Sequence, residues 1–142
     1  MELLNALSAP RATTLFVRNS IRANCLTADA VGNCVYVTGD LISGLHQVTT
    51  CDPTDFAKMP AVGVIVSKDT DTLCTVLVLG EIEGLTGLSV RKVVFVGLDG
   101  KIASAPPPPP VGGFVFIQHL GSVTDGQRVL LNPNFHMIKR ID

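Results

Sequence analysis

Short apolar segments rich in β-branched residues alternate along the chain with clusters of Gly, Asn, Asp and Pro. These clusters are typical of turns, because their residues supply positive φ angles or Asx turns. Between them the pattern predicts short strands, and such strands at regular spacing are typical of a sandwich or barrel. We therefore expect an all-β fold, a small tulip-like β-barrel or sandwich. The predicted strands are Thr13–Arg18, Cys34–Val37, His46–Thr49, Ala61–Ser67, Cys74–Gly80, Lys92–Val96, Lys101–Ala103, Gly113–Leu120 and Arg128–Leu131.

Helix is scarce in this pattern. Thr54–Met59 is expected to form one turn, with Thr54 or Asp52 as its cap and Pro60 ending it. No helical segment reaches the length at which an isolated helix becomes stable.

Two predicted strands are apolar at every position instead of alternating. These are Val76–Leu79 and Phe114–Ile117. A strand covered on one side alternates, so both faces of these strands need cover. A second sheet, a closed barrel or a neighbouring subunit would each provide it.

The first residues form a separate region in our domain assignment, an extended N-terminal arm (1–12) ahead of a single β domain (13–142). Leu3, Leu4 and Leu7 are apolar, and Pro10 and Arg11 follow them without a strand pattern. Exposing such a segment to water is unfavourable. We expect the arm to bind a partner.

A polyproline loop is predicted at Pro106–Pro110, which is Pro106, Pro107, Pro108, Pro109 and Pro110 in succession. Five prolines form a polyproline II rod about 15 Å long. Two interpretations are open: a stiff loop between strands, or a contact with a neighbouring subunit or an aromatic groove.

The charge content supports association with other proteins. Only 16% of the 142 residues are charged, against about 25% in a typical soluble domain. The net charge of −1 argues against a direct nucleic-acid interface, and no apolar run approaches the roughly 18 residues of a spanning helix. No signal peptide is expected. Burial in an oligomer or a larger assembly remains as the explanation.

Cys25, Cys34, Cys51 and Cys74 show no spacing typical of a zinc site. Free buried thiols are one interpretation, and disulfides within or between chains are the other. Cys25 and Cys34 flank a turn and could pair across a hairpin. Cys51 follows a strand, so we expect it to be exposed and available to a neighbouring chain.

The remaining side chains provide no catalytic site. Glu81 and Glu83 lie two residues apart, on one face at the end of a strand, where a rim position accounts for them. No phosphate-binding loop, nucleophile elbow, metalloprotease or calcium motif is present. We therefore predict that the protein is not an enzyme and uses no metal and no cofactor.

A resemblance to a known class of proteins lies in the order of several segments between Ala23 and Pro133. The segments are Leu26–Val31, Val35–Val37, Met59–Ile65, Val76–Leu88, Val94–Val96, Asp99–Ile102, Pro106–Pro110 and Val129–Pro133. In this order they resemble the capsid decoration (cement) proteins of tailed bacteriophages and related β-rich domains of phage heads and fibres.

The resemblance implies a structural protein of the virion. Such a protein is expected to form a homotrimer on the outer surface of the capsid and to bind the major capsid protein, bridging its subunits. The strands that are apolar on both faces would then supply trimer contacts, and Leu3, Leu4, Leu7 and Arg11 would lie along the capsid. The alternative is a fibre, tail or baseplate domain for attachment or receptor binding.

Overall fold

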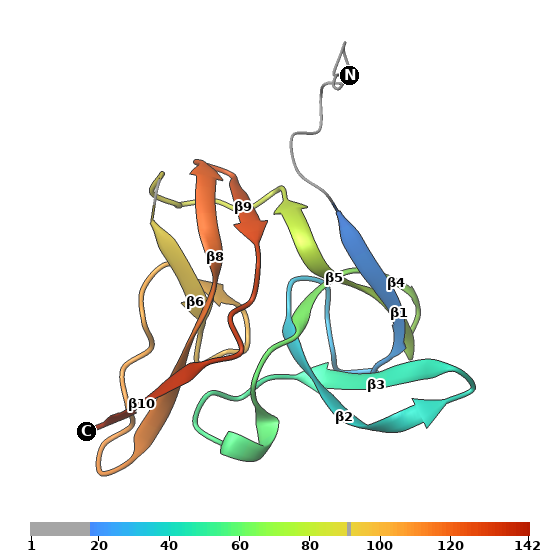
Figure 1. Ribbon diagram of the computed structural model, residues 1–142, viewed down its shortest axis with the longest axis horizontal. Helices are drawn as coiled ribbons and strands as arrows, with labels where there is room; N and C mark the ends of the chain where they lie inside the picture. The colour runs from blue at the N-terminus through green and yellow to red at the C-terminus, as the bar shows by residue number, and fades with distance from the viewer. Residues whose placement is uncertain (1–17, 91) are drawn as a thin grey trace.

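The structure, a computed structural model, describes residues 18–90 and 92–142. Its regular elements are strands and one short 3₁₀ helix (Figure 1), so the all-β prediction is confirmed. They are β1 (Asn19–Asn24), β2 (Cys34–Ile42), β3 (Leu45–Thr50), η2 (Phe56–Lys58), β4 (Gly63–Thr70), β5 (Leu73–Ile82), β6 (Val93–Val96), β7 (Ile102–Ala103), β8 (Phe114–Asp125), β9 (Arg128–Leu131) and β10 (Met137–Ile141).

The first five strands close into a barrel. Their order is β1-β3-β2-β4-β5, and β1 also pairs with β5, which completes the ring. The end of β5 continues past the barrel and pairs with β9. A second sheet follows in the order β9-β8-β6-β7, with β10 paired to the first half of β8. Figure 1 shows this second sheet beside the barrel, with β5 leading from one to the other.

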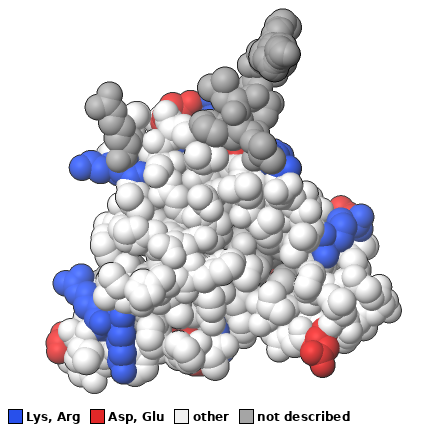
Figure 2. Space-filling view, in the orientation of Figure 1, with Lys and Arg blue, Asp and Glu red and all other residues white. Residues whose placement is uncertain are grey.

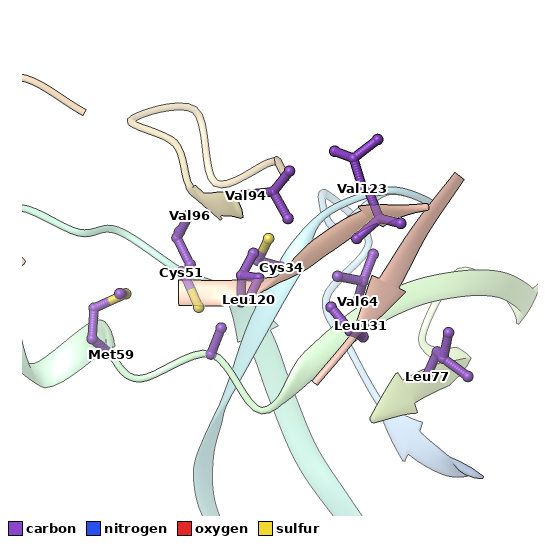
Figure 3. Close-up of a cluster of buried hydrophobic side chains, with 12 residues drawn as sticks. Cys34, Cys51, Met59, Val64, Leu77, Val94, Val96, Leu120, Val123 and Leu131 are labelled. Carbon is purple, nitrogen blue, oxygen red and sulfur yellow. The ribbon is translucent and has the colours of Figure 1, made fainter. Parts of the chain in front are cut away.

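Two apolar cores result from this arrangement. One lies inside the barrel and includes Val35, Ile65 and Val76. The other lies between the barrel wall and the second sheet (Figure 3), in a cluster that includes Leu77 of the barrel wall and Leu120 of the second sheet. Successive strand residues point to opposite faces. A strand of the barrel wall therefore needs apolar residues on both sides.

The cover predicted for Val76–Leu79 therefore comes largely from within the chain. Val76 and Leu77 are both fully buried, one in each core. The expectation that this strand supplies trimer contacts is wrong for these two residues, since the closed barrel and the second sheet already cover them.

The strand predictions differ from the structure mainly at the ends of the chain. The predicted strand Thr13–Arg18 lies outside the described residues except for Arg18, which belongs to no strand. β1 and β10 were not predicted, because their polar residues hide the strand pattern. The predicted turn Thr54–Met59 is confirmed as η2, but its cap is Asp55, whose side chain accepts from the Ala57 N–H. No helix of the described ranges is long and apolar enough to cross a membrane.

A buried carboxylate holds the loop between β1 and β2 against the barrel. Asp29 accepts hydrogen bonds from the Leu26 N–H (2.8 Å), the Thr49 hydroxyl (2.9 Å), and the N–H (3.1 Å) and hydroxyl (2.6 Å) of Thr50. Burial raises the pKa of Asp29, but the hydrogen bonds from Thr50, Leu26 and Thr49 together leave it below its ordinary value. The folded state therefore favours the ionised form.

This carboxylate gives the first prediction, a change in the acid sensitivity of the fold. A lowered pKa contributes stability that is present above the unfolded-state pKa near 3.8 and is lost as pH falls through the folded-state pKa. We expect Asp29→Asn to lower the free energy of unfolding at pH 7 by about 2 kcal/mol. The difference in this free energy between the variant and the wild type should become smaller below about pH 4. Urea unfolding of both proteins at several pH values measures this. A difference in unfolding free energy that does not change with pH would contradict this role of the Asp29 carboxylate.

Candidate assembly surface

Three phenylalanines and an isoleucine lie together at one end of the molecule, where Phe56 and Ile141 are exposed and Phe114 and Phe116 are half-buried. Phe114 and Phe116 lie on β8, with ring centroids 5.5 Å apart. Phe56 of η2 stacks against Phe116 at 5.3 Å, and its side chain is 65% exposed. Ile141 pairs directly with Phe114 across the β8–β10 ladder, and it is 71% exposed. We call these four residues the aromatic strip.

The ammonium of Lys139 borders the aromatic strip. Lys139 pairs with Phe116 in the ladder, so it lies on the same face of the sheet. Its ammonium lies 4.5 Å from the centroid of the Phe114 ring, within the range of a cation–π interaction. The strip therefore offers an apolar surface with one positive charge at its margin.

The segment that carries Phe56 is held in place by hydrogen bonds to β8. The Phe116 N–H donates to the Pro53 carbonyl at 2.7 Å. The fully buried Gln118 forms two more bonds: its Oε1 accepts from the Ala61 N–H (2.7 Å), and its Nε2 donates to the Ala61 carbonyl (2.8 Å). These contacts fix both ends of the segment between β3 and β4. Phe56 is thereby placed against β8.

Within that segment, Asp52 stabilises the turn before η2. Its Oδ1 accepts from the hydroxyl (2.6 Å) and the N–H (2.9 Å) of Thr54. The hydroxyl hydrogen bond is the main reason that the pKa of Asp52 is lowered, and the charge of Lys58 adds to it against a smaller effect of burial. The Asp52 side chain therefore stabilises the turn that precedes η2. The N-cap of η2 is Asp55, and not Asp52 or Thr54 as the sequence predicts.

The strand β10 forms an edge beside the aromatic strip. Among the described residues it pairs with β8 alone. Ile138 is exposed on the face opposite the strip, since it pairs with Ile117. Lys139 and Arg140 are exposed charges on this edge, and charged side chains of this kind discourage unspecific pairing between edge strands.

The polyproline loop lies next to the end of β10. Pro107 is buried and Pro109 half-buried, and the other three prolines are exposed. A turn follows, closed by a hydrogen bond from the Gly113 N–H to the Pro110 carbonyl (2.9 Å), with Val111 99% exposed at its tip. The Asp142 carboxylate accepts from the Gly112 N–H at 2.8 Å. The predicted loop is thus tied to β10, and its contact with a second subunit stays a prediction.

A second exposed apolar group lies on the hairpin of β2 and β3. Leu41 and Ile42 are each more than half exposed, and the two-residue turn Ser43-Gly44 has positive φ at both positions, as a tight hairpin requires. In Figure 2 the charged side chains lie mainly at the margins of the view, and a broad face between them is uncharged.

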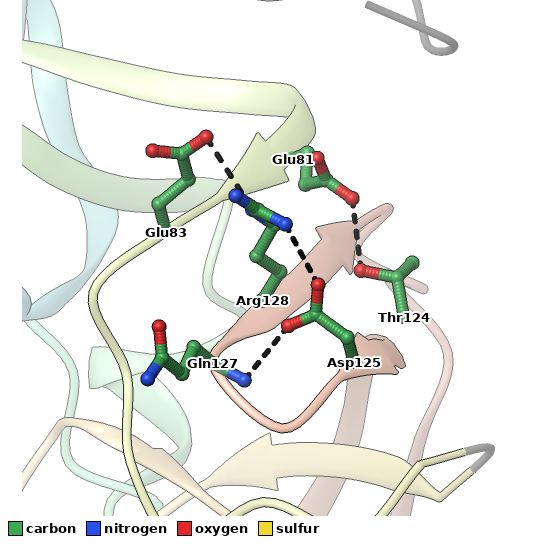
Figure 4. Close-up of polar contacts among 6 residues, drawn as sticks. All are labelled: Glu81, Glu83, Thr124, Asp125, Gln127 and Arg128. Atoms are coloured by element: carbon green, nitrogen blue, oxygen red, sulfur yellow. Dashed lines mark hydrogen bonds and ion pairs between the residues drawn. The ribbon is translucent and has the colours of Figure 1, made fainter.

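Charged side chains at the ends of β5 and the β8–β9 hairpin form a cluster of ion pairs. Arg128 lies 2.7 Å from Asp125 and 3.4 Å from Glu83, and Glu81 accepts from the Thr124 hydroxyl at 2.8 Å (Figure 4). Hydrogen bonds from Gln127 and Arg128 lower the pKa of Asp125, and the pairing with Asp125 raises that of Arg128. The cluster is a solvent-exposed ion pair network at the ends of β5 and the β8–β9 hairpin.

A cavity of about 560 Å³ lies next to this cluster. Its apolar wall includes Val66, Ile82 and Leu85, and Glu81 and Glu83 lie on its polar side. No group of three or more His, Cys, Asp or Glu residues in the described ranges is placed to hold a metal ion. The predicted absence of an enzymatic activity stays a prediction.

The cysteines differ from two of the sequence expectations. All four are free thiols and buried, so the expected exposure of Cys51 is wrong. Cys25 and Cys34 do not face each other across a hairpin, because Cys25 lies in the barrel core and Cys34 in the core between the layers. Their neighbours are Cys74 and Cys51, respectively. These pairs join distant parts of the chain, which local turn signals do not reveal.

The remaining predicted site residues, Leu3, Leu4, Leu7 and Arg11, lie outside the described residues. The apolar pattern marks Phe114–Ile117 as a segment that needs cover, but no signal in the sequence points to Phe56 or Ile141. Comparison of the chain with protein-family models, with curated proteins and with solved structures gives no match in any of the three.

Proposed function

We propose that the protein is a structural component of a phage virion, a trimeric decoration protein that binds the outer surface of the head and bridges subunits of the major capsid protein. The observation that carries this proposal is the aromatic strip. Contiguous exposed aromatic and aliphatic side chains mark protein-binding surfaces, and aromatic residues are enriched where binding energy is concentrated. The low charge content and the resemblance of the segments between Ala23 and Pro133 support the same conclusion.

The strip fits a rigid contact with the capsid. Phe56 and Phe116 lie on segments fixed by backbone and Gln118 hydrogen bonds, so little conformational entropy is lost on binding. The expected partner surface is apolar, with a carboxylate placed to meet Lys139. A protein that binds only the assembled shell stabilises that shell by mass action.

The loop of Pro106–Pro110 with Val111 is proposed as the contact between subunits of the trimer. Val111 is almost completely exposed, and polyproline is already rigid before it binds. The turn after the prolines is attached to Asp142, so the loop is presented in a fixed position. The arm with Leu3, Leu4, Leu7 and Arg11 is proposed as a further capsid contact.

Substitution of the strip tests the capsid contact. We expect Phe56→Ser to weaken binding to expanded heads of the encoding phage by about 30-fold, the loss expected when an aromatic anchor is truncated. Titration of labelled protein onto purified heads measures it. Leu41→Ser is the matched control, because Leu41 is similarly exposed on the distant β2–β3 hairpin.

Three outcomes would contradict the proposal. If Leu41→Ser weakens head binding and Phe56→Ser does not, the strip is not the capsid contact. If Phe56→Ser dissociates the trimer in sedimentation analysis, the strip is a subunit interface. Binding to tail or receptor preparations with no binding to heads would favour the fibre, tail or baseplate function.

A further inference from the structure

Two of the four cysteines lie directly opposite each other where β2 and β3 pair. Val35 pairs with Thr50 in this antiparallel ladder, so the next pair in the same register is Cys34 and Cys51. The Cys51 N–H donates to the Cys34 carbonyl at 2.9 Å, which shows that the register continues to this pair. Partners of this kind project their side chains to the same face of the sheet. Both thiols are therefore buried in the core between the barrel wall and the second sheet (Figure 3).

The spacing of such a pair suits a disulfide bond. Hydrogen-bonded partners in an antiparallel ladder have Cα atoms about 5.5 Å apart, and disulfides join residues whose Cα atoms are roughly 4.4 to 6.8 Å apart. The pair also lies at the end of the ladder, because the Cys34 N–H donates outside it, to the Gly100 carbonyl at 2.7 Å. Cys51 is the first residue after β3. The backbone can therefore adjust at this point to the geometry of the bond.

The other two cysteines are not placed opposite each other. Cys74 of β5 pairs with Ala23 of β1. Cys25 lies opposite Thr72, since its N–H donates to the Thr72 carbonyl at 3.0 Å. Both of these thiols belong to the barrel core, on the other side of the barrel wall from the first pair. We expect them to stay reduced, and they serve as an internal comparison.

We propose that Cys34 and Cys51 form an intrachain disulfide when the chain folds under oxidising conditions, which joins the start of β2 to the end of β3. With glutathione disulfide as oxidant, the thiolate of one cysteine attacks a sulfur atom of the oxidant and releases one glutathione thiolate. The thiolate of the second cysteine then attacks the mixed disulfide and releases the other. Two protein thiols are oxidised, glutathione disulfide is reduced to two thiols, and the two protons end on these thiols.

The folded core determines when this bond forms. Burial raises the pKa of Cys34 to about 12, and burial together with the nearby charges of Cys34 and Asp52 raises the pKa of Cys51. The thiolate is the species that reacts, so the closed core suppresses the reaction. We therefore expect the bond to form during refolding, before the second sheet covers the pair. The same burial then shields the finished bond from reductants.

Oxidative refolding tests the pairing. The full chain is unfolded, refolded in a buffer of reduced and oxidised glutathione, alkylated, and digested without reduction by a protease that cleaves before aspartate. At least one Asp lies between each cysteine and the next in the sequence, so every cysteine falls in its own peptide. Mass spectrometry should find one crosslink, from Cys34 to Cys51, and alkylated Cys25 and Cys74.

The melting temperature provides a second measurement. The oxidised protein should unfold about 10 °C above its reduced form, the shift expected for closing a loop of roughly 17 residues. Cys51→Ala should abolish this rise. Cys74→Ala is the matched control, because Cys74 is equally buried but lies in the barrel core, and it should retain the rise. Each variant is compared with its own reduced form, so the loss of a core side chain does not affect the comparison.

Four results would each overturn the proposal. They are four alkylated thiols after refolding, a crosslink that includes Cys25 or Cys74, crosslinks only between chains, and a rise in melting temperature that persists in Cys51→Ala. The peptide map of the wild-type chain decides the pairing even if a variant does not fold. None of these results depends on whether the protein binds capsids.

Discussion

Gln118→Ala is expected to lower the free energy of unfolding by about 4 kcal/mol. Gln118 is fully buried, and its amide forms two hydrogen bonds with the backbone of Ala61, which is also fully buried. The substitution removes the side chain and leaves the Ala61 N–H and carbonyl without partners. Buried polar groups without partners are strongly destabilising.

Urea denaturation of wild type and variant measures this loss. Gln118→Met, which roughly keeps the volume, should lose about 2 kcal/mol from the missing hydrogen bonds alone. Gln127→Ala is the matched control, because Gln127 is exposed, and it should change stability by less than about 0.5 kcal/mol. A loss for Gln118→Ala no larger than that of the control would contradict the role of Gln118 in holding the Phe56 segment to β8.

Gly63→Ala is expected to destabilise the fold by about 3 kcal/mol or more, since overpacking a rigid site is costly. A Cβ at Gly63 would overlap the carbonyl oxygen of Leu77 and the Cγ1 of Val76. Leu77 pairs with Val64 in the β4–β5 ladder, so its carbonyl cannot move without breaking the barrel wall.

The same substitution at another strand glycine provides the control. A Cβ at Gly39 of β2 would meet no atom within 4 Å, and Gly39 has no positive φ. Gly39→Ala should therefore leave stability within about 0.5 kcal/mol of wild type. Equal losses of stability in Gly63→Ala and Gly39→Ala would contradict this explanation, because only the Cβ at position 63 would overlap the Leu77 carbonyl.

The apolar pattern of the chain predicts the barrel wall well. Val76 and Leu77 need cover on both faces, and the structure provides it from the barrel core and the core between the layers. The choice among a closed barrel, a second sheet and a subunit was open, because the pattern records that a face is buried and not which element covers it. The polar strands β1 and β10 were missed, since their pairing partners, β5 and β8, stabilise them more than their own residues do.

The candidate surface depends on contacts between distant segments. Phe56 follows a turn and Phe116 lies on a strand far along the chain, and nothing in either local sequence indicates that their rings meet. The sequence offered two signals, the low charge content and the segment Phe114–Ile117 with apolar residues at every position, and neither predicts that Phe56 and Ile141 join Phe114 and Phe116.

The central claim is the proposed place of this chain on the head of a phage, and electron cryomicroscopy of phage heads incubated with the purified chain tests it most directly. The account predicts trimers in many copies on the outer surface of the head, with Phe56, Phe114, Phe116 and Ile141 facing the major capsid protein. Density for the chain only at the tail, baseplate or fibres, or its absence from the particle, would contradict it.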